Sequence, residues 1–192
     1  RTPEPVQFTG PTMGTTYHVT VSGADASHER RAVQAAIDQV LVETERHLST
    51  YHVTSEIALL NRDESRSWQD VSPTLFVVLQ QARDVSQLTA GSFDVTVAPL
   101  LRLWGYEPGS VGPSAPTTFQ APTSGQLDQV RTSVGYAKLE LRSAPRMSVR
   151  KSASGMQLTV DGIAPGYAVD RIANALRVLG HADFIVEIGG EV

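Results

Sequence analysis

The chain has 192 residues, of which 41% are hydrophobic and 19% charged, with a formal net charge of -4. This length is sufficient to bury a substantial core, and the composition is that of an ordinary globular protein. The slightly acidic balance argues against a nucleic-acid-binding surface, no apolar run approaches the roughly 18 residues of a membrane helix, and the absence of cysteine excludes disulfides and thiolate metal sites.

The N-terminal half is expected to contain a strand followed by two long helices. Residues 15–21 alternate between apolar and polar side chains, which predicts a half-buried strand. Residues 29–48 repeat apolar side chains at helical spacing, with Ser27 as the expected N-cap. Ser72 and Pro73 supply a cap and a first-position proline for the next helix, whose apolar stripe continues to Val85.

The C-terminal half begins with residues 107–125, which are rich in Pro, Gly, Ser and Thr and are expected to form a long flexible loop. The elements expected after it are a helix over 127–134, strands over 136–141, 147–151 and 157–160, a helix over 167–179 and a strand over 184–188. Interspersed strands and helices of this kind indicate a mixed α/β or α+β architecture.

The two ends of the sequence suggest a chain that is part of something longer. The first residue is Arg1 rather than Met, which suggests a processed or trimmed product in which any upstream targeting segment would not be visible. The last expected strand runs into Gly189 and Gly190, a turn that normally leads to a further element. We therefore expect this chain to be the N-terminal portion of a larger protein.

The loop from Asp161 to Gly166 is the first candidate binding segment. It lies between an expected strand and an expected helix, where free backbone N–H groups and the helix dipole favour an anion. A plain strand-to-helix turn explains the same residues, because neither the GxGxxG nor the P-loop pattern is present.

The second candidate is the segment 91–100, which Pro99 is expected to end and in which Asp94 and Thr96 could hydrogen-bond a ligand. Trp104 and Tyr106 follow it and could form the walls of a planar site, although a role in the core accounts for Trp104 equally well. Both interpretations stay open at this point.

The third candidate is the segment 48–61, in which Tyr51 could stack on a ring or cover the end of a helix. Ser55 is the expected cap of a short helix that follows. The five histidines of the chain show no metal-binding spacing, and GxSxG is absent, so solvated or structural roles are expected for them.

Five motifs occur in a specific order along the chain. They are PTMGTTY at 11–17; LSTY at 48–51 with SE at 55–56 and LN at 60–61; GSFDVTVAPL at 91–100 with LWG at 103–105; GIAPGYAVDR at 162–171; and IGGE at 188–191. In this order and spacing they resemble the ApbE-type FAD:protein FMN transferase family, formerly described as thiamine-biosynthesis lipoproteins. The resemblance covers essentially all of the chain, but only about the first two-thirds of such a protein.

The resemblance implies a fold and an activity. The fold is an α+β single domain of the T-fold type, in which helices flank a mixed or antiparallel sheet, so that residues 1–192 form one flavin-transferase domain that is incomplete at its C-terminus. The activity is the transfer of FMN from FAD to a Ser or Thr hydroxyl of an acceptor flavoprotein in an electron-transfer system, with release of AMP. A divalent metal, usually magnesium, neutralises charge on the phosphates, and such proteins are exported to the periplasm and often anchored by a lipid.

The resemblance also assigns site residues, although it identifies no catalytic residue. The residues that it places against FAD are Met13, Tyr51, Ser92, Phe93, Asp94, Asp161 and Tyr167. The first five would line the flavin or adenine part of the site, whereas Asp161 and Tyr167 would touch the dinucleotide. The backbone carbonyl of Ala164 would bind the metal, and the bare loop around it would lie against the pyrophosphate.

Two residues depart from the family pattern. The family commonly has Lys at the position of Pro165 and Gly or Ser at the position of Asp161, and its remaining metal ligands lie in the C-terminal part that this chain lacks. These departures keep two alternatives open. One is an FAD-binding flavin carrier without turnover, and the other is an FAD pyrophosphatase in which water replaces the acceptor hydroxyl.

Overall fold

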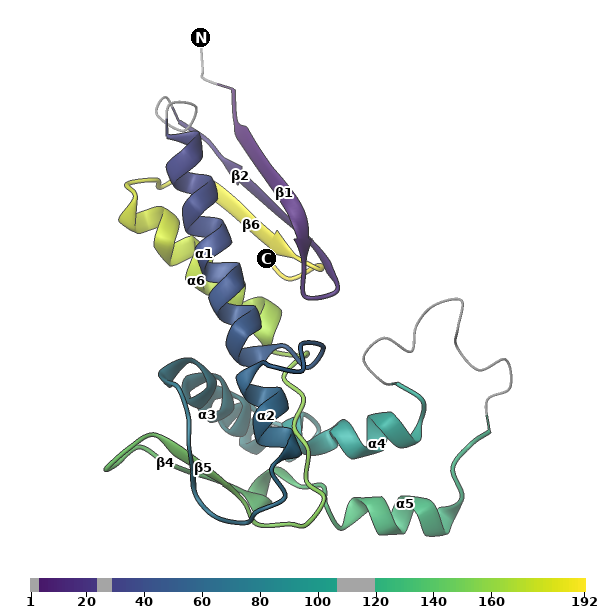
Figure 1. Ribbon diagram of the computed structural model, residues 1–192. Coiled ribbons are helices and arrows are strands. Elements are labelled where there is room, and N and C mark those ends of the chain that lie inside the picture. Colours follow the sequence, from purple (N-terminus) through teal and green to yellow (C-terminus); the bar gives the residue numbers. More distant parts are fainter. Residues whose placement is uncertain (1–3, 24–28, 107–119) are drawn as a thin grey trace. The chain divides into compact units, whose positions relative to one another are not determined.

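The computed structural model describes residues 4–23, 29–106 and 120–192 (Figure 1). Helices and antiparallel strands alternate along the chain, which confirms the α+β class. Within these ranges no helix combines the length and the apolar character needed to cross a membrane. The expected N-cap Ser27 and residues 107–119 of the expected loop lie outside the described residues.

The chain divides into two compact units. The first unit combines Arg1–Arg46 with Ile163–Val192, and the second unit is His47–Gly162. Each unit has its own antiparallel sheet and its own buried apolar residues. The organisation as one domain stays a prediction, and the two units are described separately.

The sheet of the first unit has the strand order β1-β2-β6 among the described residues. Its strands are β1 (Val6–Thr12), β2 (Thr15–Val21) and β6 (Phe184–Ile188), and both pairings are antiparallel. The bounds of β2 and β6 are those that side-chain alternation predicts. Strand β1 was not predicted, because Gly10 and Pro11 interrupt its alternation and both residues are depleted in strands.

Helices α1 (Arg30–Leu48) and α6 (Ala164–Val178) supply the rest of the core of the first unit. Apolar side chains of both helices pack with those of the three strands, and most of them are fully buried. The buried helix residues of this core are Val33, Ile37, Leu41, Ala168, Val169, Ile172 and Leu176. The predicted helix over 167–179 begins earlier than expected, at Ala164, because Pro165 is accommodated in its first turn.

The second unit contains a three-stranded sheet of order β3-β5-β4 in the described residues, together with several short helices. The strands are β3 (Gln69–Asp70), β4 (Leu139–Arg142) and β5 (Ser148–Lys151). The helices are α2 (Glu56–Arg62), α3 (Pro73–Leu88), α4 (Ala98–Leu103) and α5 (Ser124–Arg131), with 3₁₀ turns η1 (Val95–Val97) and η2 (Tyr136–Lys138).

The caps predicted for α2 and α3 are confirmed. The hydroxyl oxygen of Ser55 accepts a hydrogen bond from the backbone N–H of Ala58, and that of Ser72 accepts one from Leu75, each at 3.2 Å. The apolar stripe of α3 is buried as expected, except that Val85 is 36% exposed at the last turn.

Several boundaries differ from the predictions for physical reasons. The strand expected at 136–141 is β4, which begins at Leu139 because Tyr136–Lys138 form the 3₁₀ turn η2. The helix expected at 127–134 is α5, which begins at Ser124 because Thr123 and Gln126 form a capping box. Pro99 was expected to end the segment 91–100, but it lies in the first turn of α4, where its missing N–H is tolerated. Residues 157–160 are extended but form no strand, because Asn61 takes the place of a neighbouring strand.

Candidate functional site

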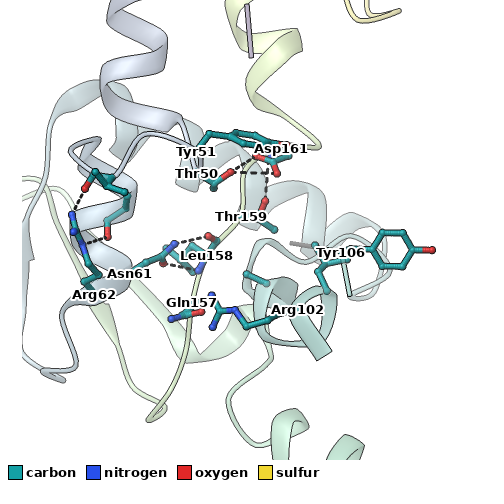
Figure 2. Close-up of a pocket in the computed structure, with 14 residues that line it drawn as sticks. Thr50, Tyr51, Asn61, Arg62, Arg102, Tyr106, Gln157, Leu158, Thr159 and Asp161 are labelled. Carbon is teal, nitrogen blue, oxygen red and sulfur yellow. Dashed lines mark hydrogen bonds between the residues drawn. The ribbon is translucent and has the colours of Figure 1, made fainter. Parts of the chain in front are cut away.

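The second unit contains a cavity of about 490 Å³ (Figure 2). Its walls come from the loop that begins at Thr50, from α2, from α4, and from the extended segment 157–161. Tyr51 and Asp161, two of the residues expected to bind FAD, line this cavity although 110 positions separate them in the sequence.

The extended segment 157–161 is held by hydrogen bonds on its buried side. The side chain of Asn61 donates to the carbonyl of Leu158 at 2.8 Å and accepts from its N–H at 2.7 Å (Figure 2). The N–H of Thr159 donates to the carbonyl of Val95 at 2.8 Å. Leu158 and Val160 are fully buried. Side chains alternate along this segment as in a strand, so Gln157 and Thr159 line the cavity wall.

The loop that carries Tyr51 is fixed by two serines. The Ser49 hydroxyl oxygen accepts hydrogen bonds from the N–H groups of Tyr51 and His52 at 3.2 Å each, and the buried Ser55 hydroxyl donates to the Ser49 carbonyl at 2.5 Å. These bonds fix the backbone while the Tyr51 side chain stays 52% exposed at the cavity. An aromatic ring held in this way can stack on a planar ligand without further ordering of its loop.

Charge and burial act together on the Tyr51 hydroxyl. Partial burial raises the pKa of this group, and the negative charge of Asp161 raises it further. The hydroxyl therefore stays protonated at neutral pH and can act as a hydrogen-bond donor. Asp161 itself accepts a hydrogen bond from the Thr50 hydroxyl at 3.1 Å, which fixes the direction of the carboxylate (Figure 2).

Lys151 holds the C-terminal end of α2 in place. Its side chain is only 5% exposed, and its ammonium donates to the carbonyls of Leu60 at 2.6 Å, Asp63 at 2.5 Å and Asn61 at 3.4 Å. Burial lowers the pKa of Lys151, while the charges of Asp63 and Glu64 act in the opposite direction. Because Asn61 lies in this last turn, Lys151 also supports the cavity wall that Asn61 binds.

Asp94 forms local hydrogen bonds within the second unit. One carboxylate oxygen caps η1 by accepting from the N–H and the hydroxyl of Thr96 at 2.8 and 2.6 Å. The other oxygen accepts from the N–H of Tyr136 at 2.8 Å. These bonds give Asp94 a structural role in joining two loops, and its expected contact with FAD stays a prediction.

Ser92 and Phe93 precede this cap. Ser92 is exposed, and Phe93 packs against Gly162, where the Cβ of any larger residue would lie 3.3 Å from the Phe93 ring. The glycine that follows Asp161 is thus explained by close packing against an aromatic ring. Phe93 can position the turn after the cavity wall, and a contact of Ser92 or Phe93 with FAD stays a prediction.

Met13 lies in the turn between β1 and β2 of the first unit. Met13 has a φ of 47° and Gly14 a φ of 74°, the combination that a two-residue hairpin turn requires and that non-glycine residues rarely adopt. The Met13 N–H and the Thr12 hydroxyl both donate to one oxygen of Glu45, at 3.1 and 3.0 Å. Glu45 therefore stabilises a turn whose backbone is unfavourable for Met.

Ala164 and Tyr167 lie in the first turn of α6, also in the first unit. Its N-cap residue, Ile163, makes no side-chain capping hydrogen bond, and the N–H of Tyr167 donates to the Ile163 carbonyl at 3.0 Å. A Cβ on Gly166 would meet no atom within 4 Å in the described structure. The turn thus offers bare backbone next to the positive end of the helix dipole, as the anion interpretation of this loop requires.

The expected magnesium site cannot be assembled from side chains in the described ranges. Among residues 4–23, 29–106 and 120–192, no three His, Asp or Glu residues lie close enough together to hold a metal ion. The Ala164 carbonyl alone would be an incomplete ligand set for a hard cation that prefers six oxygen ligands. Magnesium therefore stays a prediction for this chain.

Sequence reasoning missed several residues of this site. Asn61 was part of a motif without an assigned role, and Gln157, Thr159 and Lys151 were not singled out. The signal for Gln157 and Thr159 was present in the alternation of QLTVD, which points every second side chain to one face. For Lys151 no signal exists, because burial of a single lysine at the end of a strand has no sequence pattern.

Comparison with curated relatives gives consistent names. An FAD:protein FMN transferase of Vibrio cholerae is 33% identical over 189 residues, which cover 98% of this chain and 54% of the relative. One of Haemophilus influenzae is 30% identical over 190 residues, covering 97% of this chain and 53% of the relative. The chain therefore spans about half the length of the curated relatives it matches, a smaller share than the motifs implied.

Solved structures and a family model agree with these relatives. The flavin transferase ApbE from Vibrio cholerae matches with a TM-score of 0.86 and 32% identity, over 97% of this chain and 58% of that one. The apo form of the Pseudomonas stutzeri flavinyl transferase ApbE matches with a TM-score of 0.86 and 27% identity, over 99% and 60% of the two chains. The model of the ApbE family matches residues 13–192, and the chain belongs to that family.

Proposed function

We propose that the complete protein is an FAD:protein FMN transferase, which moves FMN from FAD to a Ser or Thr hydroxyl of an acceptor protein and releases AMP. The observation that carries the proposal is the match to the ApbE family over residues 13–192. The cavity of the second unit supports it, since it combines an exposed aromatic ring with carboxylate and amide groups, as a nucleotide site requires.

The proposed chemistry is a phosphoryl transfer. The acceptor oxygen attacks the FMN-side phosphorus, the bond from that phosphorus to the bridging oxygen breaks, AMP leaves with the electron pair, and the hydroxyl proton is released. Such reactions depend mainly on positioning and on charge stabilisation, so we assign binding and orienting roles to the residues of this chain. A bound magnesium ion would neutralise phosphate charge, with the Ala164 carbonyl as one proposed ligand and the others from outside the described residues.

We assign the cavity of the second unit to one ring of FAD and its adjoining sugar or ribityl chain. Tyr51 would stack on the ring, and Asp161 would accept a hydrogen bond from a sugar hydroxyl, as carboxylates do in other nucleotide sites. Met13, Tyr167, Ser92, Phe93 and Asp94 are each proposed to contact FAD in the complete protein.

The cellular context is also a proposal, supported by the resemblance of the five motifs. We propose that the complete protein is exported to the periplasm, with a lipid anchor outside this chain. The acceptor would be a flavoprotein of an electron-transfer system. Export can be tested by fractionating cells that produce the full-length protein, in which a periplasmic or membrane-associated signal is expected.

The decisive test is intact mass spectrometry of the full-length protein incubated with FAD, magnesium and an acceptor domain. We expect the acceptor to gain the mass of one FMN less one water and AMP to appear, and chelation of the metal should stop both. Free FMN without acceptor labelling would instead indicate an FAD pyrophosphatase. Bound FAD without any AMP would indicate a flavin carrier, and absence of FAD binding would contradict all of these functions.

Replacing Tyr51 by Ala should weaken FAD binding by about 1 kcal/mol, or roughly fivefold in Kd, because one aromatic pair is lost. Tyr51→Phe keeps the ring and should bind FAD nearly as well as the wild type. Isothermal titration calorimetry on the full-length protein measures both. Equal affinity of the Ala variant and the wild type would remove Tyr51 from the site.

A further inference from the structure

The amide of Gln157 is an unsatisfied polar group in the wall of the cavity. Its oxygen Oε1 is buried, and it has no hydrogen-bond partner among the described residues. Gln157 lines the same cavity as Tyr51 and Asp161 (Figure 2). A buried oxygen without a partner costs about 1–3 kcal/mol, so a group that donates a hydrogen bond to it would bind favourably.

Neighbouring polar side chains of the cavity are already used by the protein. Asn61 is fully engaged with the backbone of Leu158, and Arg62 donates to the carbonyls of Ala58 and Val53. These bonds hold both side chains in the wall of the cavity. Gln157 differs from them because its amide oxygen has no such bond.

The position of Gln157 relative to Asp161 indicates the length of the ligand. The two residues are four positions apart on an extended segment with the same alternation, which separates their Cα atoms by about 13 Å. A heteroaromatic ring with an attached sugar spans a distance of this order. Both groups are hydrogen-bond acceptors, and Figure 2 shows Asp161 near the top of the labelled side chains and Gln157 below Thr159 and Leu158.

We propose that Gln157 determines specificity by accepting a hydrogen bond from an N–H group on the edge of the bound ligand's ring system. The ligand class is a heteroaromatic ring with an N–H on its edge, joined to a polyol whose hydroxyls reach Asp161. Both ends of FAD fit this description, through the 6-amino group of adenine or the N3–H of the flavin. The inference rests on the proposed function and specifies which chemical group of the ligand is recognised in the cavity.

The test compares three variants of the full-length protein with two uncharged probes, adenosine and riboflavin, by isothermal titration calorimetry. Gln157→Met removes the hydrogen-bond acceptor but keeps a side chain of similar size. It should raise the Kd of the probe that occupies this cavity about fivefold. Gln157→Glu keeps an acceptor at the same place and should bind that probe much better than the Met variant. Gln129→Met, an exposed change on α5, is the matched control and should leave both affinities unchanged.

The outcomes distinguish adenine from the flavin ring as the bound group. They also distinguish the role of Gln157 from the proposed transferase function. Weakening confined to adenosine supports the inference with adenine in the cavity, and weakening confined to riboflavin supports it with the flavin ring. If Gln157→Met leaves both affinities unchanged, or if Gln157→Glu is as weak as the Met variant, the inference is overturned. The proposed function stands or falls separately, because FMN transfer by the wild-type protein tests it without reference to Gln157.

Discussion

Replacing Asn61 by Asp should lower the free energy of unfolding by about 3 kcal/mol and abolish most FAD binding. The Asp side chain can still accept from the N–H of Leu158, but it no longer donates to the Leu158 carbonyl, which lies 2.8 Å from the amide nitrogen. A carboxylate oxygen would then face a buried carbonyl oxygen, an unpaired and repulsive arrangement. Urea denaturation of the two proteins at neutral pH measures the loss.

The binding defect follows from the same contact. Asn61 holds the segment that carries Gln157, Thr159 and Asp161, so its loss displaces one wall of the cavity. Asn174→Asp, an isosteric change on the exposed face of α6, is the matched control and should alter neither stability nor binding appreciably. Wild-type stability in the Asn61 variant would show that the segment is held by other contacts.

Replacing Lys151 by Met should also destabilise the protein by about 3 kcal/mol. The Met side chain fills most of the volume but leaves the carbonyls of Leu60, Asn61 and Asp63 without their shared donor. Lys138→Met is the control, since its ammonium also donates to two carbonyls but is only half-buried, so water can replace it. A loss of about 1 kcal/mol or less is expected there. Equal losses at the two sites would contradict the importance of burial.

The pH dependence of stability gives an independent test of the Lys151 environment. Burial lowers the pKa of Lys151 in the folded protein below the ordinary lysine value of 10.5. Between those two pKa values the unfolded chain binds more protons than the folded protein, so the free energy of unfolding should rise with pH. The rise should be larger in the wild type than in the Lys151→Met variant. Parallel pH profiles for the two proteins would contradict a lowered pKa.

The regular elements were predictable where side-chain pattern and capping act locally. Alternation predicted β2 and β6, and Ser72 with Pro73 marked the start of α3, because these signals require no distant partner. Strand β1 was not predicted because Gly10 and Pro11 interrupt its side-chain alternation. Its pairing with β2 stabilises the strand in spite of these two residues.

The cavity was predictable only in part, because its geometry depends on distant contacts. The five motifs brought Tyr51 and Asp161 into one hypothesis, and both line the cavity. Alternation over 157–160 predicted a strand, which the structure does not form, because alternation cannot distinguish a neighbouring strand from the single side chain of Asn61. In the same way, the polar side chain of Asp94 suggested that it could bind a ligand. Only the fold shows that its carboxylate accepts hydrogen bonds from Thr96 and Tyr136.

The hydrogen bonds that hold the wall 157–161 affect how easily its ligand specificity can be altered by mutation. A central strand of a sheet has neighbours on both edges, and each of its side chains must suit the side chains across from it. This wall is held through the backbone of Leu158 and Thr159, so the outward positions carry no cross-strand partner in the described structure. Positions 157, 159 and 161 are therefore suited to directed evolution of nucleotide preference, in which a small library could vary all of them without disturbing β-sheet pairing.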